Sequence, residues 1–239
     1  YWTSIHRPIV AFDRVLGEGI PSVGSDHEQG GRLIADLLIR TGAHHVVMIG
    51  GPRDQFFDLA ARGEVEDVFD LEKTTFPTVR YYLTLEQELM KAGIRYEYVE
   101  AGEVMDFDGY RRAVGETLDR VGPDGVDAVV SSDIGASFCV REALRRGIAI
   151  PQDLQIVAYD GTYLTDLAGM KTTAVVQDFV AITQTVADHI TQAIADEDAA
   201  AAKASLRKDD NPFEPSVLIP VTLALGDTTR AVSAAADHS

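Results

Sequence analysis

Asp13, Asp133 and Asp160 each come at or just past the end of an apolar segment that the residue pattern predicts to be a buried strand. In open α/β sheets, ligands bind outside the carboxyl ends of the strands, where the loops converge. Ionised carboxylates at that edge suit a ligand with many hydroxyl groups, because each carboxylate accepts two or more charge-assisted hydrogen bonds. The pattern therefore indicates a site for a hydroxyl-rich small molecule. The three segments are residues 9–12, 128–130 and 154–158.

Two other interpretations of these aspartates stay open. Asp133 is as well suited to cap the helix expected to follow it as to contact a ligand. Asp160 is followed by Gly161 and not by an apolar helix, which favours the ligand. The three carboxylates also suit an acid/base set in an enzyme, which would need a nucleophile, a histidine or a metal nearby.

Other chemistry-bearing residues do not complete such an enzyme site. The six histidines show no metal-site spacing, and the chain has no G-x-S-x-G elbow, Walker loop or G-x-G-x-x-G fingerprint. Cys139, the single cysteine, lies in an apolar helical segment and excludes an internal disulfide. We therefore expect no metal, no cofactor and no catalytic residue. Arg62 and Arg80 are both candidate donors to sugar oxygens, and their spacing does not choose between them.

Short apolar segments alternate with helical patterns from residue 8 onward, which is typical of βα units and a largely parallel sheet. Helices are expected after caps at Asp26 and Asp108, from Pro77, and over 133–146 and 179–195. Residues 53–75 are acidic and weakly periodic, and we interpret them as a surface excursion. The remaining expected strands are residues 22–25, 46–49, 96–99, 217–219 and 221–225.

Composition and charge limit the classes of molecule that this chain is expected to bind. The 239 residues are 46% hydrophobic and 25% charged, as in ordinary globular proteins. The net charge of −17, from 21 basic and 38 acidic residues, argues against direct binding of nucleic acid or anionic membranes. No apolar run is long enough to cross a bilayer. Because Tyr1 is not an initiator methionine and a strand is expected almost at once, the chain is expected to be cut from a longer protein.

Six short motifs stand in order between about Pro8 and Thr229. They are Asp26-His27-Glu28-Gln29-Gly30-Gly31-Arg32 with Gly42; Val46-Val47-Met48-Ile49-Gly50-Gly51-Pro52; Ser132-Asp133; Ile150-Pro151-Gln152-Asp153-Leu154 leading to Tyr159-Asp160-Gly161; Thr172-Thr173 with Gln177-Asp178-Phe179; and Leu218-Ile219-Pro220-Val221-Thr222-Leu223. Each is weak alone, but their order and spacing are specific together. The chain resembles the effector domain of the lactose-repressor/galactose-repressor (LacI/GalR) family of transcription regulators.

The resemblance implies a two-lobed α/β fold of the periplasmic-binding-protein type, with parallel sheets flanked by helices and with the first lobe incomplete. The implied parts are residues 1–25 and 178–216 for the partial N-terminal lobe, 26–177 and 217–230 for the C-terminal lobe, and 231–239 for a tail. It also implies a cleft for a small polar effector, expected to be a sugar. The implied ligand-binding residues are Asp13, Arg80, Ser132, Asp133, Asp160, Gln177 and Phe179.

The resemblance implies a cytoplasmic protein that is not an enzyme and that acts by allosteric regulation. Sugar binding would control operator affinity through an N-terminal helix-turn-helix that this chain lacks, in a protein that is a homodimer when full length. DNA would be contacted only through that absent domain, and no membrane is involved. A periplasmic or secreted sugar-binding protein of a transporter is the alternative, and an α/β enzyme is a third possibility. Ser132 and Gly161 stand where the family commonly has asparagine and aspartate, and Val104 where it often has an aromatic, which leaves the effector's identity open.

Overall fold

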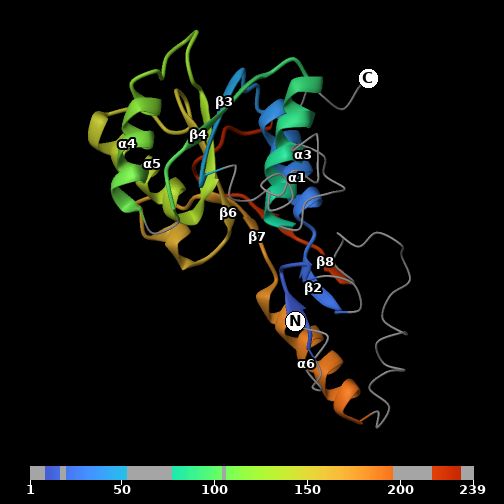
Figure 1. Ribbon diagram of the computed structural model, residues 1–239. Helices are drawn as coiled ribbons and strands as arrows, with labels where there is room; N and C mark the ends of the chain where they lie inside the picture. The colour runs from blue at the N-terminus through green and yellow to red at the C-terminus, as the bar shows by residue number, and fades with distance from the viewer. Residues whose placement is uncertain (1–8, 17–19, 53–76, 104–105, 196–216, 233–239) are drawn as a thin grey trace. The chain divides into compact units, whose positions relative to one another are not determined.

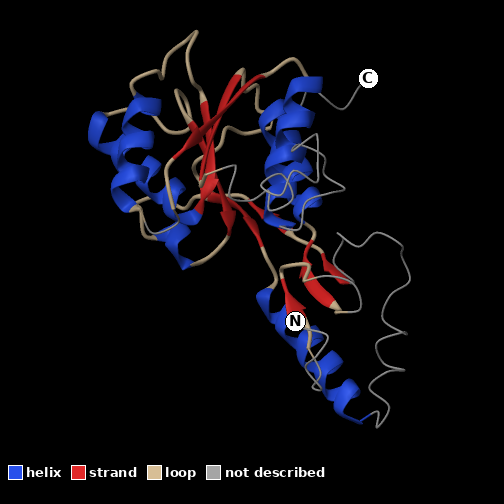
Figure 2. Ribbon diagram, viewed as in Figure 1, coloured by secondary structure: helices blue, strands red, loops and turns tan. Residues whose placement is uncertain are grey.

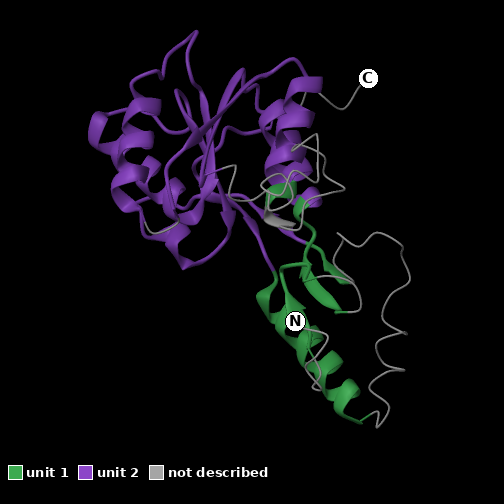
Figure 3. Cartoon of the chain, in the orientation of Figure 1, with its two compact units in different colours: residues 1–27, 56–80, 178–220 green, residues 28–55, 81–177, 221–239 purple. Residues whose placement is uncertain are grey.

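A computed structural model of the 239-residue chain describes residues 9–16, 20–52, 77–103, 106–195 and 217–232 (Figure 1). Its contacts divide the chain into two compact units (Figure 3). We call residues 1–27, 56–80 and 178–220 the small unit, and residues 28–55, 81–177 and 221–239 the large unit. No helix within the described ranges has the length and apolar character needed to cross a membrane.

The large unit is built on a six-stranded sheet with the order β4-β3-β5-β6-β7-β9. The first five strands are parallel, and β9 pairs antiparallel with β7 at one edge. Continuous apolar runs form the central strands because both faces of a parallel sheet are covered. The expected α/β fold with a largely parallel sheet is confirmed. The strands are β3 (His45–Gly50), β4 (Arg95–Glu100), β5 (Ala128–Ser132), β6 (Gln155–Asp160), β7 (Thr173–Val176) and β9 (Thr222–Ala224).

Helices cover both faces of this sheet, with α4 and α5 on one face and α1 and α3 on the other (Figure 2). Alternate residues of β3 serve the two faces, since successive side chains of a strand point to opposite sides. Val47 and Ile49 pack with α4 and α5, whereas Val46 and Met48 pack with α1 and α3. The helices are α1 (His27–Arg40), α3 (Pro77–Lys91), α4 (Phe107–Leu118) and α5 (Asp133–Arg146), with a 3₁₀ turn η4 (Tyr163–Asp166).

A tight packing point joins α1, α3 and β6. The ring of Tyr159 stacks on the ring of Tyr81, with centroids 3.9 Å apart and an interplanar angle of 6°. A Cβ atom on Gly30 would lie 2.7 Å from the Tyr159 ring, and one on Gly31 would lie 2.7 Å from the carbonyl oxygen of Tyr81. The glycine pair of the first motif therefore allows α1 to approach its neighbours closely, as only a residue without Cβ can.

The small unit contains a parallel sheet with the order β1-β2-β8, and helix α6 packs against β2. We expected residues 217–219 to belong to the C-terminal lobe, and this was wrong. β8 pairs with β2, while β9, three residues further on, pairs with β7 in the other sheet. The elements are β1 (Ala11–Phe12), β2 (Ser22–Ser25), β8 (Val217–Ile219) and α6 (Phe179–Ala195).

Three helices are followed by a glycine, and one helix begins at a different cap from the expected one. Gly42, Gly93 and Gly147 follow helices with φ values of 71°, 73° and 71°, the left-handed conformation in which glycine ends a helix. The cap of α4 is Asp106 and not Asp108, because the Asp106 side chain accepts the N–H of Gly109 at 2.8 Å. The predicted excursion over residues 53–75 lies outside the described residues.

Candidate functional site

Asp160 ends β6 at the carboxyl edge of the large sheet, with φ at 110°, a value that residues other than glycine rarely adopt. One of its carboxylate oxygens accepts a hydrogen bond from Nε2 of Gln177 at 2.7 Å. The backbone N–H of Gln177 also donates to the carbonyl oxygen of Asp160, at 3.3 Å. These two bonds bring together two predicted site residues from neighbouring strand ends. Asp160 keeps part of its surface exposed.

Asp133, the first residue of α5, is buried and bonded to the loop after β6. Its two carboxylate oxygens accept the N–H groups of Gly161 at 3.1 Å and Thr162 at 2.5 Å. Burial raises the pKa of the Asp133 carboxyl, and the hydrogen bonds from Thr162 and Gly161 oppose that rise. The capping interpretation is wrong, because Ser132 caps the helix by accepting the N–H of Gly135. Asp133 therefore holds the segment that carries Asp160.

Ser132 adds a hydroxyl beside these carboxylates, and a tyrosine that the sequence reasoning missed lies next to it. Burial raises the pKa of Tyr110, a hydrogen bond with the Ser132 side chain lowers it, and the nearby charge of Asp160 raises it. Tyr110 is not among the site residues that the sequence predicts. Because its phenol comes from a helix and not from a strand end, the strand-end pattern gave no signal for it. Four predicted residues and Tyr110 thus gather at one edge of the large unit.

Asp13 is the site residue of the first strand in the small unit. It has φ at 47°, and its Oδ1 atom lies 2.9 Å from Nε2 of His27 and 3.3 Å from the N–H of Ser25. His27 is buried, so its ring is a fixed neighbour of the carboxylate. A Cβ on Gly24 would lie 2.7 Å from Oδ1 of Asp13, which explains glycine there. The sequence analysis names His27 only as part of the motif that begins at Asp26, and not as a site residue.

Arg80 and Phe179, the other predicted site residues, also fall in the small unit. Arg80 lies in the first turn of α3 and is buried, with 5% of its surface exposed. Phe179 is the first residue of α6 and is exposed. Asp178 precedes it and caps the helix by accepting the N–H of Ala181 at 2.9 Å. Arg62, the alternative to Arg80, lies outside the described residues.

The edge residues of the large unit suit recognition of a neutral polar molecule. Asp160 supplies acceptor oxygens, and Ser132 and Gln177 supply groups that donate or accept hydrogen bonds. Among the described residues, no group of three or more histidines, cysteines, aspartates and glutamates could hold a metal ion. Cys139 is buried, and burial raises the pKa of its thiol to about 12, which makes it unreactive. The local chemistry is that of binding through hydrogen bonds.

We expect Asp133→Asn to lower the free energy of unfolding by about 1–3 kcal/mol, the usual cost of an unsatisfied buried hydrogen-bonding group. An asparagine keeps one acceptor oxygen, but its amide nitrogen would face the N–H of Gly161 or Thr162. Urea unfolding measures the loss, and hydrogen exchange at those two amides should become faster. Asp166→Asn, at an exposed aspartate of η4, is the control and should change stability by less than about 0.5 kcal/mol. Equal stability of the two variants would contradict the role given to Asp133.

The chain matches a known protein family and known structures. Residues 35–229 match the family model described as periplasmic binding protein-like domain. The chain belongs to this family. It is also similar to the solved structure of a periplasmic binding protein/LacI transcriptional regulator from Alkaliphilus metalliredigens complexed with D-xylulofuranose, with a TM-score of 0.69 and 20% sequence identity. That match covers 96% of this chain and 73% of the other, and it supports the family fold.

Several curated proteins to which the chain is similar are named as operon repressors. The chain is 28% identical over 165 residues to the sucrose operon repressor of Streptococcus mutans, covering 69% of this chain and 44% of the repressor. It is 28% identical over 160 residues to the ribose operon repressor of Bacillus subtilis, covering 66% of this chain and 42% of the repressor. The chain therefore spans less than half the length of these two relatives. The resemblance to LacI/GalR effector domains is confirmed.

Proposed function

We propose that this chain is the sugar-sensing domain of a DNA-binding transcription regulator and that it acts without catalysis. The observation that carries the proposal is the group of hydrogen-bonding side chains at the carboxyl edge of the large sheet, centred on Asp160 and Gln177. Relatives named as sucrose and ribose operon repressors support a sugar effector, as does a structural neighbour complexed with D-xylulofuranose. These names favour a regulator over a transporter's binding protein.

In this proposal Asp160 accepts hydrogen bonds from sugar hydroxyls, and Ser132 and Gln177 add donors and acceptors. Asp133 positions the loop after β6 through Gly161 and Thr162. Asp13, Arg80 and Phe179 contribute from the small unit. Bidentate donors such as a guanidinium suit sugar oxygens, and an aromatic face suits the apolar side of a sugar ring.

Regulation follows if the sugar binds one arrangement of the two units better than another. A ligand shifts an equilibrium only by the difference in its affinity for the two states. The operator would then be contacted by a separate basic segment, because residues 1–239 carry a net charge of −17 and repel phosphates. We propose a homodimer for the longer regulator, in which two such segments bind two half-sites.

The test is a thermal-shift screen of this chain with a set of sugars and polyols that includes sucrose, D-ribose and D-xylulose. A sugar that binds only the folded state raises Tm, by an amount equivalent to about 2.7 kcal/mol at a hundredfold excess over Kd. Asp160→Asn should remove the shift, because it deletes the carboxylate charge and one acceptor oxygen. Asparagine is chosen because it tolerates positive φ better than alanine, so the backbone at this position is kept.

Asp124→Asn is the matched control, since Asp124 is exposed and lies away from the strand ends that carry Ser132 and Asp160. Its sugar response should equal that of the original chain. An equal sugar-induced rise in Tm in Asp160→Asn and Asp124→Asn would show that Asp160 does not take part in sugar binding. A chain that is not stabilised by any sugar or polyol, while remaining folded by circular dichroism, would overturn the proposed effector class.

A further inference from the structure

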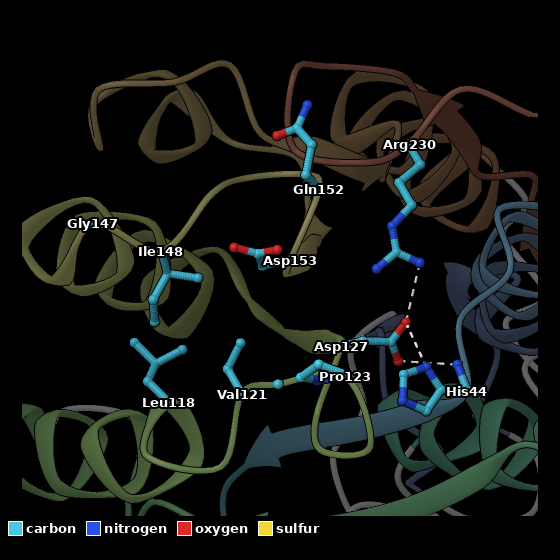
Figure 4. A pocket seen from close by; sticks show the side chains of 11 residues that line it. His44, Leu118, Val121, Pro123, Asp127, Gly147, Ile148, Gln152, Asp153 and Arg230 are labelled. Atoms are coloured by element: carbon cyan, nitrogen blue, oxygen red, sulfur yellow. Dashed lines mark hydrogen bonds and ion pairs between the residues drawn. The ribbon is translucent and has the colours of Figure 1, made fainter.

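The large unit has a pocket at the amino ends of its strands, which is the side of the sheet opposite to the one that carries Asp133 and Asp160. Its volume is about 430 Å³, within the range of small-molecule sites. The residues around it precede β3, β5 and β6, end helices α4 and α5, or follow β9. We call it the amino-edge pocket (Figure 4). The proposed sugar site does not use it.

One side of this pocket is made by the guanidinium of Arg230, which is held from several directions. Its Nη1 atom donates to Oδ2 of Asp127 at 3.1 Å and to the carbonyl oxygen of Gly42 at 3.3 Å. Its Nε atom donates to the carbonyl oxygen of Pro151 at 3.2 Å. The remaining nitrogen, Nη2, makes no hydrogen bond with any residue in the described ranges. Arg230 therefore presents a fixed cationic donor to the pocket.

The facing side carries the carboxylate of Asp153 (Figure 4). Its Oδ2 atom accepts a long hydrogen bond from the N–H of Ala149 at 3.4 Å, and Oδ1 has no hydrogen-bond donor within the described part of the chain. Asp153 and Arg230 do not form an ion pair with each other, although both line the pocket. Helix α5 ends beside it at Gly147, and the partial negative charge of a helix C-terminus adds to that of the carboxylate. A cationic donor and an anionic acceptor thus face one cavity without satisfying each other.

The rest of the wall is apolar. Leu118 at the end of α4, Val121 after it and Ile148 after α5 lie together at one side (Figure 4). Leu118 is buried, and Val121 and Ile148 are partly buried against the core beneath α4 and α5. Such a wall suits an aliphatic or aromatic side chain, because covering it removes apolar surface from water.

We propose that the amino-edge pocket binds an α-amino acid with an apolar side chain. The α-carboxylate accepts hydrogen bonds from Nη2 of Arg230, the α-ammonium donates to Asp153, and the side chain lies on Leu118, Val121 and Ile148. Arg230 already pairs with Asp127, which also lines the pocket, but its Nη2 atom remains as a donor, so a zwitterion matches that donor and the carboxylate of Asp153. A simple anion would meet the charges of Asp127 and Asp153, and a simple amine would leave Nη2 of Arg230 without an acceptor, so neither matches both.

The test is calorimetric titration of the 239-residue chain with L-leucine and L-phenylalanine. Two analogues of leucine each lack one charged group: 4-methylpentanoate has no ammonium, and 3-methylbutylamine has no carboxylate. We expect at least one of the two amino acids to bind, and both leucine analogues to bind at least about tenfold more weakly than leucine, because each loses a charge-assisted hydrogen bond and leaves its partner unpaired.

Asp153→Asn should weaken amino-acid binding by about tenfold or more. The control Asp166→Asn makes the same change at an exposed aspartate of η4 that does not line the pocket, and it should leave binding unchanged. Asp153 is exposed, so the variant keeps the fold. The absence of binding by both amino acids at millimolar concentration would overturn the proposal, as would equal affinity of Asp153→Asn and the original chain. The sugar response, which depends on Asp160, should survive in Asp153→Asn, so failure here is distinguishable from failure of the proposed function.

Discussion

Asp127→Ala should lower the free energy of unfolding by about 3–5 kcal/mol, the usual cost of breaking a buried ion pair by removing one partner. The Asp127 side chain is only 4% exposed. Its Oδ1 atom accepts the N–H groups of His44 at 3.0 Å and His45 at 2.9 Å, and its Oδ2 atom lies 3.1 Å from both Nη1 of Arg230 and Nδ1 of His44. Alanine would leave two backbone donors and a guanidinium without their acceptor.

Urea unfolding of Asp127→Ala and of Asp124→Ala measures this effect. The exposed Asp124 should change stability by less than about 0.5 kcal/mol. The double variant Asp127→Ala/Arg230→Met tests the cause, since it removes both charges of the pair. Its loss should be smaller than the sum of the two single losses, because neither charge is then left alone. A loss below about 1 kcal/mol for Asp127→Ala would refute the role of the pair as a structural link.

Tyr159→Ala is expected to cost about 3–5 kcal/mol, as for other large aromatic residues truncated in a core. Tyr159 is buried, stacks on Tyr81 and fills the space that Gly30 leaves open. Removing the ring therefore opens a cavity between β6 and helices α1 and α3. Tyr159→Phe keeps the ring and should cost less than about 1.5 kcal/mol, as for a substitution that conserves volume.

Gly30 allows a sharper measurement of the same contact. In the original chain, Gly30→Ala should destabilise the fold, because the new Cβ would lie 2.7 Å from the Tyr159 ring. In the Tyr159→Ala background, the same change should be stabilising by about 0.5–1 kcal/mol, the helix preference of alanine over glycine. Thermal or urea unfolding of the original chain, the two single variants and the double variant gives the sign of the stability change caused by Gly30→Ala in each background. If Gly30→Ala has the same effect in both backgrounds, the two residues do not limit each other.

The strands of the large sheet were predictable because burial on both faces demands continuous apolar runs, as in residues 46–49 and 128–130. The position of Asp133 and Asp160 at one sheet edge followed from parallel topology alone. Their separate roles did not. Whether Asp133 caps a helix or binds the N–H groups of Gly161 and Thr162 depends on the path of a loop, which residue types do not encode.

The sequence did not predict several other features, for similar reasons. The apolar runs 217–219 and 221–225 look alike, and periodicity does not indicate which sheet a strand joins, so β8 was assigned to the wrong one. His27 and Asp13 are 14 residues apart, and their contact requires β1 and β2 to be paired first. Asp106 and Asp108 both suit a helix start, and backbone geometry selected Asp106. Tertiary context decided each of these cases.

The antiparallel strand β9 has a consequence for synthesis of the protein. It completes the large sheet by covering the edge of β7, yet Thr222–Ala224 lies 46 residues after Val176 in the chain. During translation, β7 therefore leaves the ribosome with open backbone N–H and C=O groups along one side. An uncovered strand edge is a template for pairing with another chain. Nascent chains that stall between these strands would consequently be the species most in need of a chaperone.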